Sequence, residues 1–235
     1  QASRYAAVSF TDRNYLAGAR LSVTEPLGRG WSGTAALDAR TGRDMHVEGV
    51  FTNALTASLR AAKRFGDDHN LSLRGTRLSS AEEAFRLTGD RLYNPAWGFQ
   101  HGKVRNSRVR REFVPLAVVS YRMPVSQSTS LAADFSAEYG TRKYSALGWY
   151  DARTPMPDNY RYLPGYTGDR ETEQAWRAGD ARYTQIDWDE LIAQNRMAAG
   201  HAVYALEDRA ERLGDLNFSA LFTTALDARL TLRYG

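Results

Sequence analysis

The side chains that could do acid–base or metal chemistry are few and scattered. The four histidines fall in separate predicted connections, at His46, His69, His101 and His201. No two of them have the HxxxH spacing that places two imidazoles on one helical face. Cysteine is absent, which excludes disulfides and thiolate ligands, and no serine has a GxSxG context. The sequence therefore predicts no catalytic residue, no metal and no cofactor, and favours a protein that is not an enzyme.

A basic run in the middle of the chain is its strongest local charge feature. The run comprises Lys103, Arg105, Arg108, Arg110 and Arg111. One interpretation is contact with lipopolysaccharide phosphates or another anionic ligand, which guanidinium groups bind well. The other is a ladder at the top of a strand, in which residues 105, 109 and 111 face one way and pair with Asp90 or Glu112. The net charge of only +4 predicts no nucleic-acid partner.

Aromatic side chains are dense in two long segments, about 78–112 and 143–206. Aromatic rings are common ligand anchors because they offer a large contact area at low entropic cost. Together with two arginines of the basic run, they give the candidate ligand-binding residues Tyr93, Trp97, Phe99, Arg105, Arg108, Trp149, Tyr150, Tyr160 and Tyr162. The alternative interpretation is that these side chains hold the two segments together.

The elements that must position these residues are strands. In Leu131–Gly140, apolar residues at odd positions alternate with Asp134, Ser136 and Glu138, so a strand here has one apolar and one wet face. The alternation lasts about ten residues, whereas strands of soluble domains usually run roughly 5–6. About ten tilted residues is the length of a strand that crosses a bilayer.

The same alternation recurs along the chain. It divides the sequence into strand regions at about 5–78, 113–142 and 207–235, separated by the two aromatic-rich segments. Charges of both signs lie on the wet faces, and beneath a soluble sheet they would be costly unless paired. The pattern predicts an all-β fold: an antiparallel transmembrane β-barrel segment of about nine strands from a larger barrel, with two long extracellular loops.

The order of the connections supports this prediction. Successive antiparallel strands deliver their connections to alternate ends of a sheet. One end receives short turns near 25–30, 66–70, 124–128 and 225–227, and the other receives both long segments. Short turns at one end and long loops at the other are typical of outer-membrane barrels.

Two short helices are predicted within the long loops. Ser80 and Glu83 have capping-box spacing, with Gly89 as the stop, and Asp187 precedes a small apolar stripe.

Aromatic residues also fall near the ends of the apolar stripes. Trp31 and Phe65 lie near the short-turn end, and Tyr15 and Tyr139 lie near the other. This placement is typical of the two aromatic girdles of a membrane barrel.

Several segments resemble a known family. Tyr93–Val109 reads YNPAWGFQHGKVRNSRV and resembles the YNPxWGYQNGKxRNxRV segment of TonB-dependent outer-membrane receptors of the Bacteroidota. Ala146–Ala152 and Pro155–Pro164 are similar to the ALNWYxAxDPRPDYYRYLPS stretch of the same receptors. Weaker landmarks in the same order are Ser9–Tyr15, Gln185–Asp189 and Glu207–Arg209.

The resemblance implies energised uptake of a scarce nutrient across the outer membrane, with a siderophore, cobalamin-like compound, peptide or glycan as cargo. It implies a plug domain and the TonB complex as partners, with outer-membrane lipid and lipopolysaccharide around the barrel and a surface lipoprotein as a further candidate partner. Such receptors have barrels of about 22 strands. We therefore expect this chain to be the N-terminal part of such a barrel, without its plug and unable to transport alone.

Two other hypotheses remain open from the residues. One is a passive or structural, porin-like outer-membrane barrel. The other is a soluble β-sandwich binding module, which the mean hydropathy of −0.53 permits. A membrane barrel can have the same mean hydropathy, because half of each strand faces water.

Overall fold

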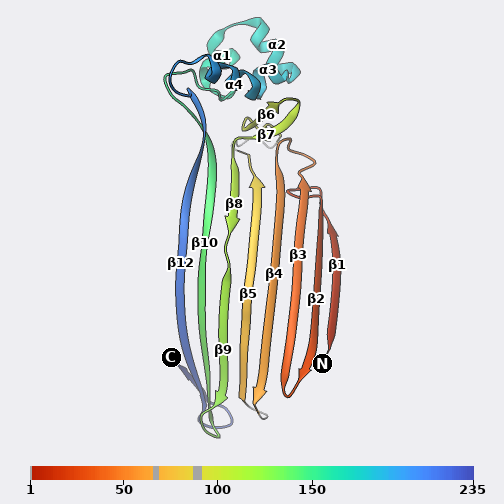
Figure 1. Ribbon diagram of the computed structural model, residues 1–235, viewed down its shortest axis with the longest axis vertical. Coiled ribbons are helices and arrows are strands. Elements are labelled where there is room, and N and C mark those ends of the chain that lie inside the picture. Colours follow the sequence, from red (N-terminus) through yellow and green to blue (C-terminus); the bar gives the residue numbers. More distant parts are fainter. Residues whose placement is uncertain (1, 66–68, 87–91) are drawn as a thin grey trace.

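One large antiparallel sheet dominates the computed structural model, which describes residues 2–65, 69–86 and 92–235 (Figure 1). Its strands follow the order β1-β2-β3-β4-β5-β8-β10-β12-β13, and β9 pairs with β5 and β10 below β8. Their bounds are β1 (Ser3–Phe10), β2 (Ala17–Gly28), β3 (Trp31–Arg43), β4 (Phe51–Phe65), β5 (His69–Ala84), β8 (Val109–Phe113), β9 (Leu116–Pro124), β10 (Thr129–Trp149), β12 (Tyr204–Ala225) and β13 (Thr231–Tyr234). The prediction of an all-β, antiparallel fold is confirmed.

The two ends of the sheet differ as the alternation of strand directions predicts. Short turns such as residues 29–30 and 125–128 close one end, and the connections from β5 to β8 and from β10 to β12 both leave the other (Figure 1). These two connections form a cap that contains β6 (Trp97–Gln100), β7 (Lys103–Asn106), η1 (Tyr160–Tyr162), α1 (Pro164–Thr167), α2 (Arg170–Ala178), α3 (Ala181–Thr184), β11 (Ile186–Asp187) and α4 (Trp188–Met197). Among the described residues, no helix is both long and apolar enough to cross a bilayer.

The strand register aligns the apolar residues of the whole sheet on one side. Leu37 lies opposite Leu21 and Ala57, and Phe135 lies opposite Val119 and Phe218. This side is called the apolar face, and its rows include Leu21, Val23, Ala35, Leu37, Leu55, Ala57, Leu59, Ala61, Val119, Leu131, Phe135, Tyr139, Leu216, Phe218 and Phe222. The intervening residues form the polar face, which includes Arg20, Thr24, Thr34, Asp38, Thr56, Ser58, Arg60, Ser72, Ser120, Arg122, Asp134, Ser136 and Glu138.

Burial on the two faces is the reverse of that in a soluble domain. On the apolar face Leu59 is 64% exposed and Phe218 is 73% exposed, whereas Ser72 and Ser120 on the polar face are only 8% and 7% exposed. Neighbouring side chains bury these serines, although no second layer of the described chain covers them.

This arrangement differs from the sandwich hypothesis. In a β-sandwich the apolar faces of two sheets meet across a dry interior about 10 Å thick. The described chain has one large sheet and a three-stranded sheet, β11-β6-β7, which belongs to the cap. The apolar rows therefore do not meet each other.

The strand region predicted from residue 113 begins as β9, and it is preceded by β8, which lies almost wholly within the predicted loop 78–112. Val114 and Pro115 lie between the two strands, and proline has no N–H to donate to the strand ladder. The chain bends close to β10 at this point, where a Cβ on Gly140 would overlap the Phe113 carbonyl oxygen. Glycine at 140 therefore permits the break.

The predicted helix from Ser80 is wrong in its described part. Strand β5 continues to Ala84, because residues up to Ala84 pair with β4 on one side and with β8 on the other. Tertiary pairing thus overrides the local capping signal. The remainder of that prediction, at 87–91, lies outside the described residues. The helix predicted after Asp187 is confirmed as α4, and the Asp187 carboxylate caps it by accepting from the Glu190 N–H.

Three further boundaries and positions differ from expectation. Both long connections are shorter than the predicted 78–112 and 143–206. The first is shorter because β5 continues to Ala84 and β8 begins at Val109, and the second because β10 and β12 stay paired up to Trp149 and Tyr204. Arg105 is in β7, so residues 105, 109 and 111 do not share one strand. Tyr15 precedes β2 and packs beneath Arg40 of the polar face, 5.7 Å from the guanidinium carbon to the ring centroid, rather than in an outer girdle.

Candidate functional site

The cap is one unit, because its two connections are joined by a parallel strand pair. Ile186 of β11 lies opposite Gly98 of β6, and Asp187 lies opposite Phe99. A Cβ at Gly98 would overlap the Ile186 carbonyl oxygen, so only glycine allows this approach. The His101 backbone N–H adds a further link by donating to the Asp189 carboxylate at 2.9 Å.

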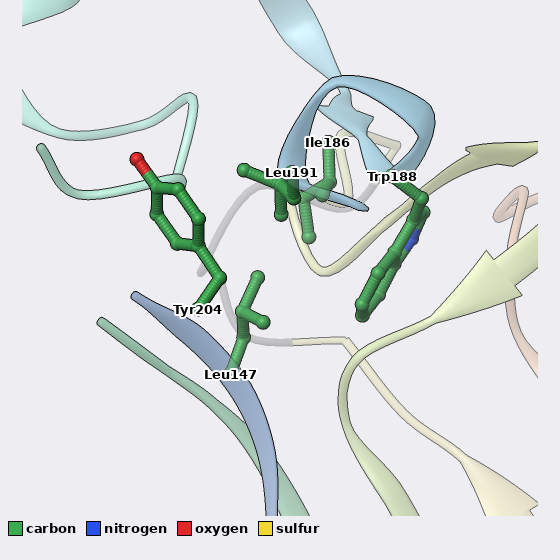
Figure 2. Packing of buried hydrophobic residues seen from close by; sticks show 5 residues of the cluster. All are labelled: Leu147, Ile186, Trp188, Leu191 and Tyr204. Atoms are coloured by element: carbon green, nitrogen blue, oxygen red, sulfur yellow. The ribbon is translucent and has the colours of Figure 1, made fainter. Parts of the chain in front are cut away.

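A small hydrophobic cluster seats the cap on the sheet. Figure 2 shows Leu147 and Tyr204, from the ends of β10 and β12, clustered with Ile186, Trp188 and Leu191 of the cap. All five are buried. The register places Leu147 and Tyr204 in the same rows as the apolar face, so at this end the cap covers rows that are exposed lower down.

Three of the predicted aromatic binding residues lie in the first connection, and two of them, Trp97 and Phe99, are in contact. Trp97 is buried, and its ring meets Phe99 edge-on at 5.3 Å. The Tyr93 hydroxyl donates to the Thr184 carbonyl oxygen at 3.0 Å, and burial of this phenol raises the pKa of Tyr93. Trp97 and Tyr93 therefore hold the cap together, whereas Phe99 stays exposed.

Arg105 also has a structural role. Its guanidinium stacks over the Trp188 ring, with 4.1 Å from the guanidinium carbon to the ring centroid, and donates to the Gln100 side-chain oxygen at 2.7 Å. Burial lowers the pKa of Arg105. The Trp188 indole N–H donates to the Arg105 carbonyl oxygen at 3.1 Å, which locks the pair. Arg108 is half-buried, and its backbone N–H donates to the Asn106 side chain at 2.7 Å.

The predicted residues of the second connection are more open. Trp149, Tyr150 and Tyr160 are exposed, and the Tyr150 hydroxyl donates to the Glu207 carboxylate. Tyr162 instead donates its hydroxyl to the Thr154 carbonyl oxygen at 2.7 Å. It also lines a cavity of about 500 Å³, together with Arg153, Arg161, Tyr183, Asp187 and Gln194. This cavity and the exposed rings are the parts of the cap that a ligand can reach.

Buried polar side chains of the cap lie outside the predicted set. Asn94 Nδ2 donates to the Glu48 carbonyl oxygen at 3.1 Å, and Ser107 Oγ donates to the Ala96 carbonyl oxygen at 2.8 Å. Ser145 Oγ donates to the Ser107 carbonyl oxygen and accepts from the Val109 N–H, at 2.8 and 2.9 Å. Asn94 and Ser107 lie within the Tyr93–Val109 segment, whereas Ser145 lies outside it. The signal that could have identified Ser145 from the sequence is a serine on the apolar side of its strand.

A second set of side chains lines the polar face below the cap. Glu112 lies between Arg110 and Arg142, with Oε1 to Nε distances of 3.4 and 3.1 Å, and Arg110 Nη2 lies 2.9 Å from Glu83 Oε2. Nearby is a cavity of about 660 Å³ whose lining includes Tyr15, Arg40, Asp44, Thr52, Glu83, Arg110 and Tyr144. Val47, Val50 and Phe85 also line it, so the cavity offers both charged and apolar contacts.

Glu112 is a carboxylate partner of the basic run, as predicted, but it pairs with Arg110 rather than with residue 105 or 111. Arg111 pairs with Glu82 at 3.0 Å and with Asp208 at 3.6 Å, while Arg110 pairs with Glu83 and Glu112. Asp90 lies outside the described residues. Two of the five cations therefore form a ladder at the top of β8 with carboxylates of neighbouring strands.

The described residues contain no group of three His, Asp or Glu side chains that could hold a metal ion. No protein-family model, curated protein or solved structure matches this chain.

Proposed function

We propose that this chain is part of an outer-membrane β-barrel that belongs to a TonB-dependent transporter or receptor. The apolar face lies against lipid, the polar face lines the lumen, and the cap lies outside the cell. The strands supply no covalent chemistry, and the cap captures cargo.

The exposed apolar face carries this proposal. On β4 the apolar run from Ala61 to Leu55 is bounded by Lys63 at the short-turn end and Asn53 at the cap end. The strand between these two bounding residues rises roughly 33 Å, and a tilt of 35–45° reduces that height to about 25 Å. The apolar band of a membrane barrel is about 25 Å tall. A band of this height, exposed on one side of a single sheet, suits lipid as its solvent.

Features of the band's edges support the same orientation. At the short-turn end, Lys63 Nζ lies over the rings of Trp31 and Phe65, 5.2 and 4.6 Å from their centroids. A lysine that extends past aromatic rings toward water is typical of a membrane interface. At the cap end, Tyr139 is exposed on the apolar face.

The resemblance of Tyr93–Val109 and Pro155–Pro164 to TonB-dependent receptors supports the transport part of the proposal. On that basis the partners are a plug domain, the TonB complex, outer-membrane lipid and a surface lipoprotein. The cargo is a siderophore, cobalamin-like compound, peptide or glycan.

The second candidate is a passive or structural barrel. The charged side chains of the polar face suit a passive barrel equally, because a water-filled lumen accommodates the same side chains. The adjoining coding sequence separates the two: a plug domain and TonB box encoded upstream favour the transporter, and their absence favours the passive barrel.

The proposed contact of the apolar face with lipid can be tested by cysteine labelling, since the native chain has no cysteine. Leu59→Cys and Phe135→Cys are compared with Ser58→Cys and Ser136→Cys, with the chain reconstituted in lipid vesicles. A water-soluble maleimide is expected to label Ser58→Cys and Ser136→Cys faster. A maleimide dissolved in the lipid phase is expected to label Leu59→Cys and Phe135→Cys faster. Equal labelling of both pairs by both reagents contradicts the proposed membrane facing.

A further inference from the structure

The upper edge of the apolar band carries a cluster of cations from three adjacent strands. Lys143 of β10 lies directly opposite Arg111 of β8, and Arg212 of β12 lies opposite Thr141. Alternation places all three on the apolar side of the sheet, where Lys143 and Arg111 are direct neighbours about 5 Å apart at Cβ and Arg212 is diagonal to Lys143 at roughly 7–8 Å. They are called the upper cationic cluster.

Two members of the upper cationic cluster have no carboxylate of their own. Arg111 is held by Glu82 and Asp208, at 3.0 and 3.6 Å. Lys143 and Arg212 are exposed, and within the described part of the chain neither forms an ion pair or side-chain hydrogen bond. The neighbouring carboxylates, which could compete with an anion for these cations, are thus paired with Arg111. Lys143 and Arg212 stay available to an anion.

The side chains directly below the cluster are apolar and uncovered. Phe113 is 50% exposed, Tyr139 is 66% exposed and Leu216 is 72% exposed. They belong to the same face: Phe113 lies in the row of Thr141 and Arg212, and Tyr139 and Leu216 lie one and two rows nearer the short-turn end. An occupant of this surface must therefore be an anion at its upper end and hydrocarbon below.

We propose that Lys143 and Arg212 bind the phosphate group of an anionic lipid whose acyl chains lie on Phe113, Tyr139 and Leu216. This inference rests on the proposed membrane facing. Charge complementarity and the change from cations to hydrocarbon within two rows of side chains select a phospholipid or phosphorylated glycolipid over a free anion. Arg111 keeps the neighbouring carboxylates neutralised.

The site differs from the basic run in the sequence. Within that run, Arg105 stacks on Trp188 inside the cap, and Arg110 pairs with Glu83 and Glu112 on the polar face. Only Arg111 of the run reaches the apolar side next to Lys143. The lipid contact therefore depends on residues that are far apart in the sequence and adjacent only through strand pairing.

The test measures binding of diphosphorylated lipid A to the chain in vesicles of phosphatidylcholine. The Lys143→Gln/Arg212→Gln variant is compared with an Arg64→Gln/Arg229→Gln control, which removes the same charge at the short-turn end. We expect the first variant to bind lipid A at least about tenfold more weakly and the control to bind it as the native chain does.

Three further outcomes are decisive. Equal lipid A binding by both variants overturns the inference, and so does full competition by millimolar inorganic phosphate, because that indicates a simple anion site. Binding that weakens at raised salt in the native chain and in the control, but not in the Lys143→Gln/Arg212→Gln variant, supports it. Insertion into phosphatidylcholine vesicles is measured in parallel: failure of the native chain to insert refutes the membrane facing itself, whereas normal insertion without a lipid A preference refutes only this inference.

Discussion

Single residues decide how the cap closes, and they do so through backbone contacts. Gly98 brings β6 against β11, and Ser145 bonds to two backbone groups from the strand next to it. Neither residue type carries distinctive chemistry. Both are required because a buried approach of two chains leaves no room for a Cβ at one point and needs a small hydroxyl at another.

We expect Gly98→Ala to loosen the cap. The added methyl group overlaps the Ile186 carbonyl oxygen and forces β11 away from β6, at a cost of about 1–3 kcal/mol. Limited proteolysis should then cleave the connection between β10 and β12 about tenfold faster. Gly165→Ala is the control, because a Cβ there meets nothing within 4 Å. Unchanged cleavage in Gly98→Ala would argue against the β6–β11 junction.

Ser145→Ala is expected to destabilise the junction of β8 and β10. It leaves the buried Val109 N–H and Ser107 carbonyl oxygen without their partner, at a cost of about 1–3 kcal/mol. The loss is measured as reduced hydrogen-exchange protection of Val109. Ser130→Ala, at an exposed position of the same strand, should leave that amide unchanged.

At the scale of elements, the shortest connections of the cap end are stabilised by one carboxylate. Asp44 accepts hydrogen bonds from the backbone N–H groups of Asn14, His46 and Val47, at 2.9, 2.8 and 2.9 Å. It thereby joins the connection before β2 to the one before β4. Burial raises the pKa of this carboxyl, but the three N–H donors together outweigh it, so the pKa of Asp44 is lowered from 3.8.

This lowered pKa predicts acid sensitivity of the two connections. A folded-state pKa below the unfolded value means that the stabilisation is complete above about pH 4 and is lost as the pH falls through the folded-state pKa. Hydrogen-exchange protection factors of Asn14, His46 and Val47 should therefore fall below pH 4.

In Asp44→Asn the protection factors of these amides should be low at every pH. Asp151→Asn removes an exposed carboxylate of the cap end that makes no such bonds among the described residues, and it should behave as the native chain does. A native chain that keeps full protection down to pH 2 would contradict this role of Asp44.

At the scale of the whole molecule, the sheet has an exposed apolar side and a polar side on which Ser72 and Ser120 are buried. In water such a sheet would expose an apolar patch far larger than a few hundred Å², which soluble monomers rarely do. In lipid the same surface needs no protein partner. The cap lies at only one end, which gives the molecule a polarity along its strands (Figure 1).

Arginine substitutions test that polarity across the sheet. Ala57→Arg and Phe135→Arg place a charge mid-band on the apolar face and should impair assembly into membranes by about 2–4 kcal/mol. Ser58→Arg and Ser136→Arg, one residue along the same strands, should assemble normally. Assembly is measured as the folded fraction in lipid vesicles by heat-modifiable electrophoretic mobility. Equal damage from both pairs would show that the faces are assigned wrongly.

The sequence by itself determined the period of the strands, the side of each strand that is apolar, and the end at which the long connections emerge. These features follow from local alternation and from counting strands, so they need no knowledge of distant contacts. The same local reasoning located α4 from its Asp187 cap. It also placed six of the seven predicted aromatic binding residues in the two connections that form the cap, and the seventh, Trp149, at the end of β10.

Tertiary structure decided what local patterns could not. Pairing of β5 with β4 and β8 turned the capping signal at Ser80 into strand, and packing on Thr184 and Trp188 made Tyr93 and Arg105 structural. Strand register alone brought Lys143 and Arg212 together. The physical reason is common to all three: the free energy of these side chains depends on partners far away in the sequence, and only the folded sheet brings those partners within contact distance.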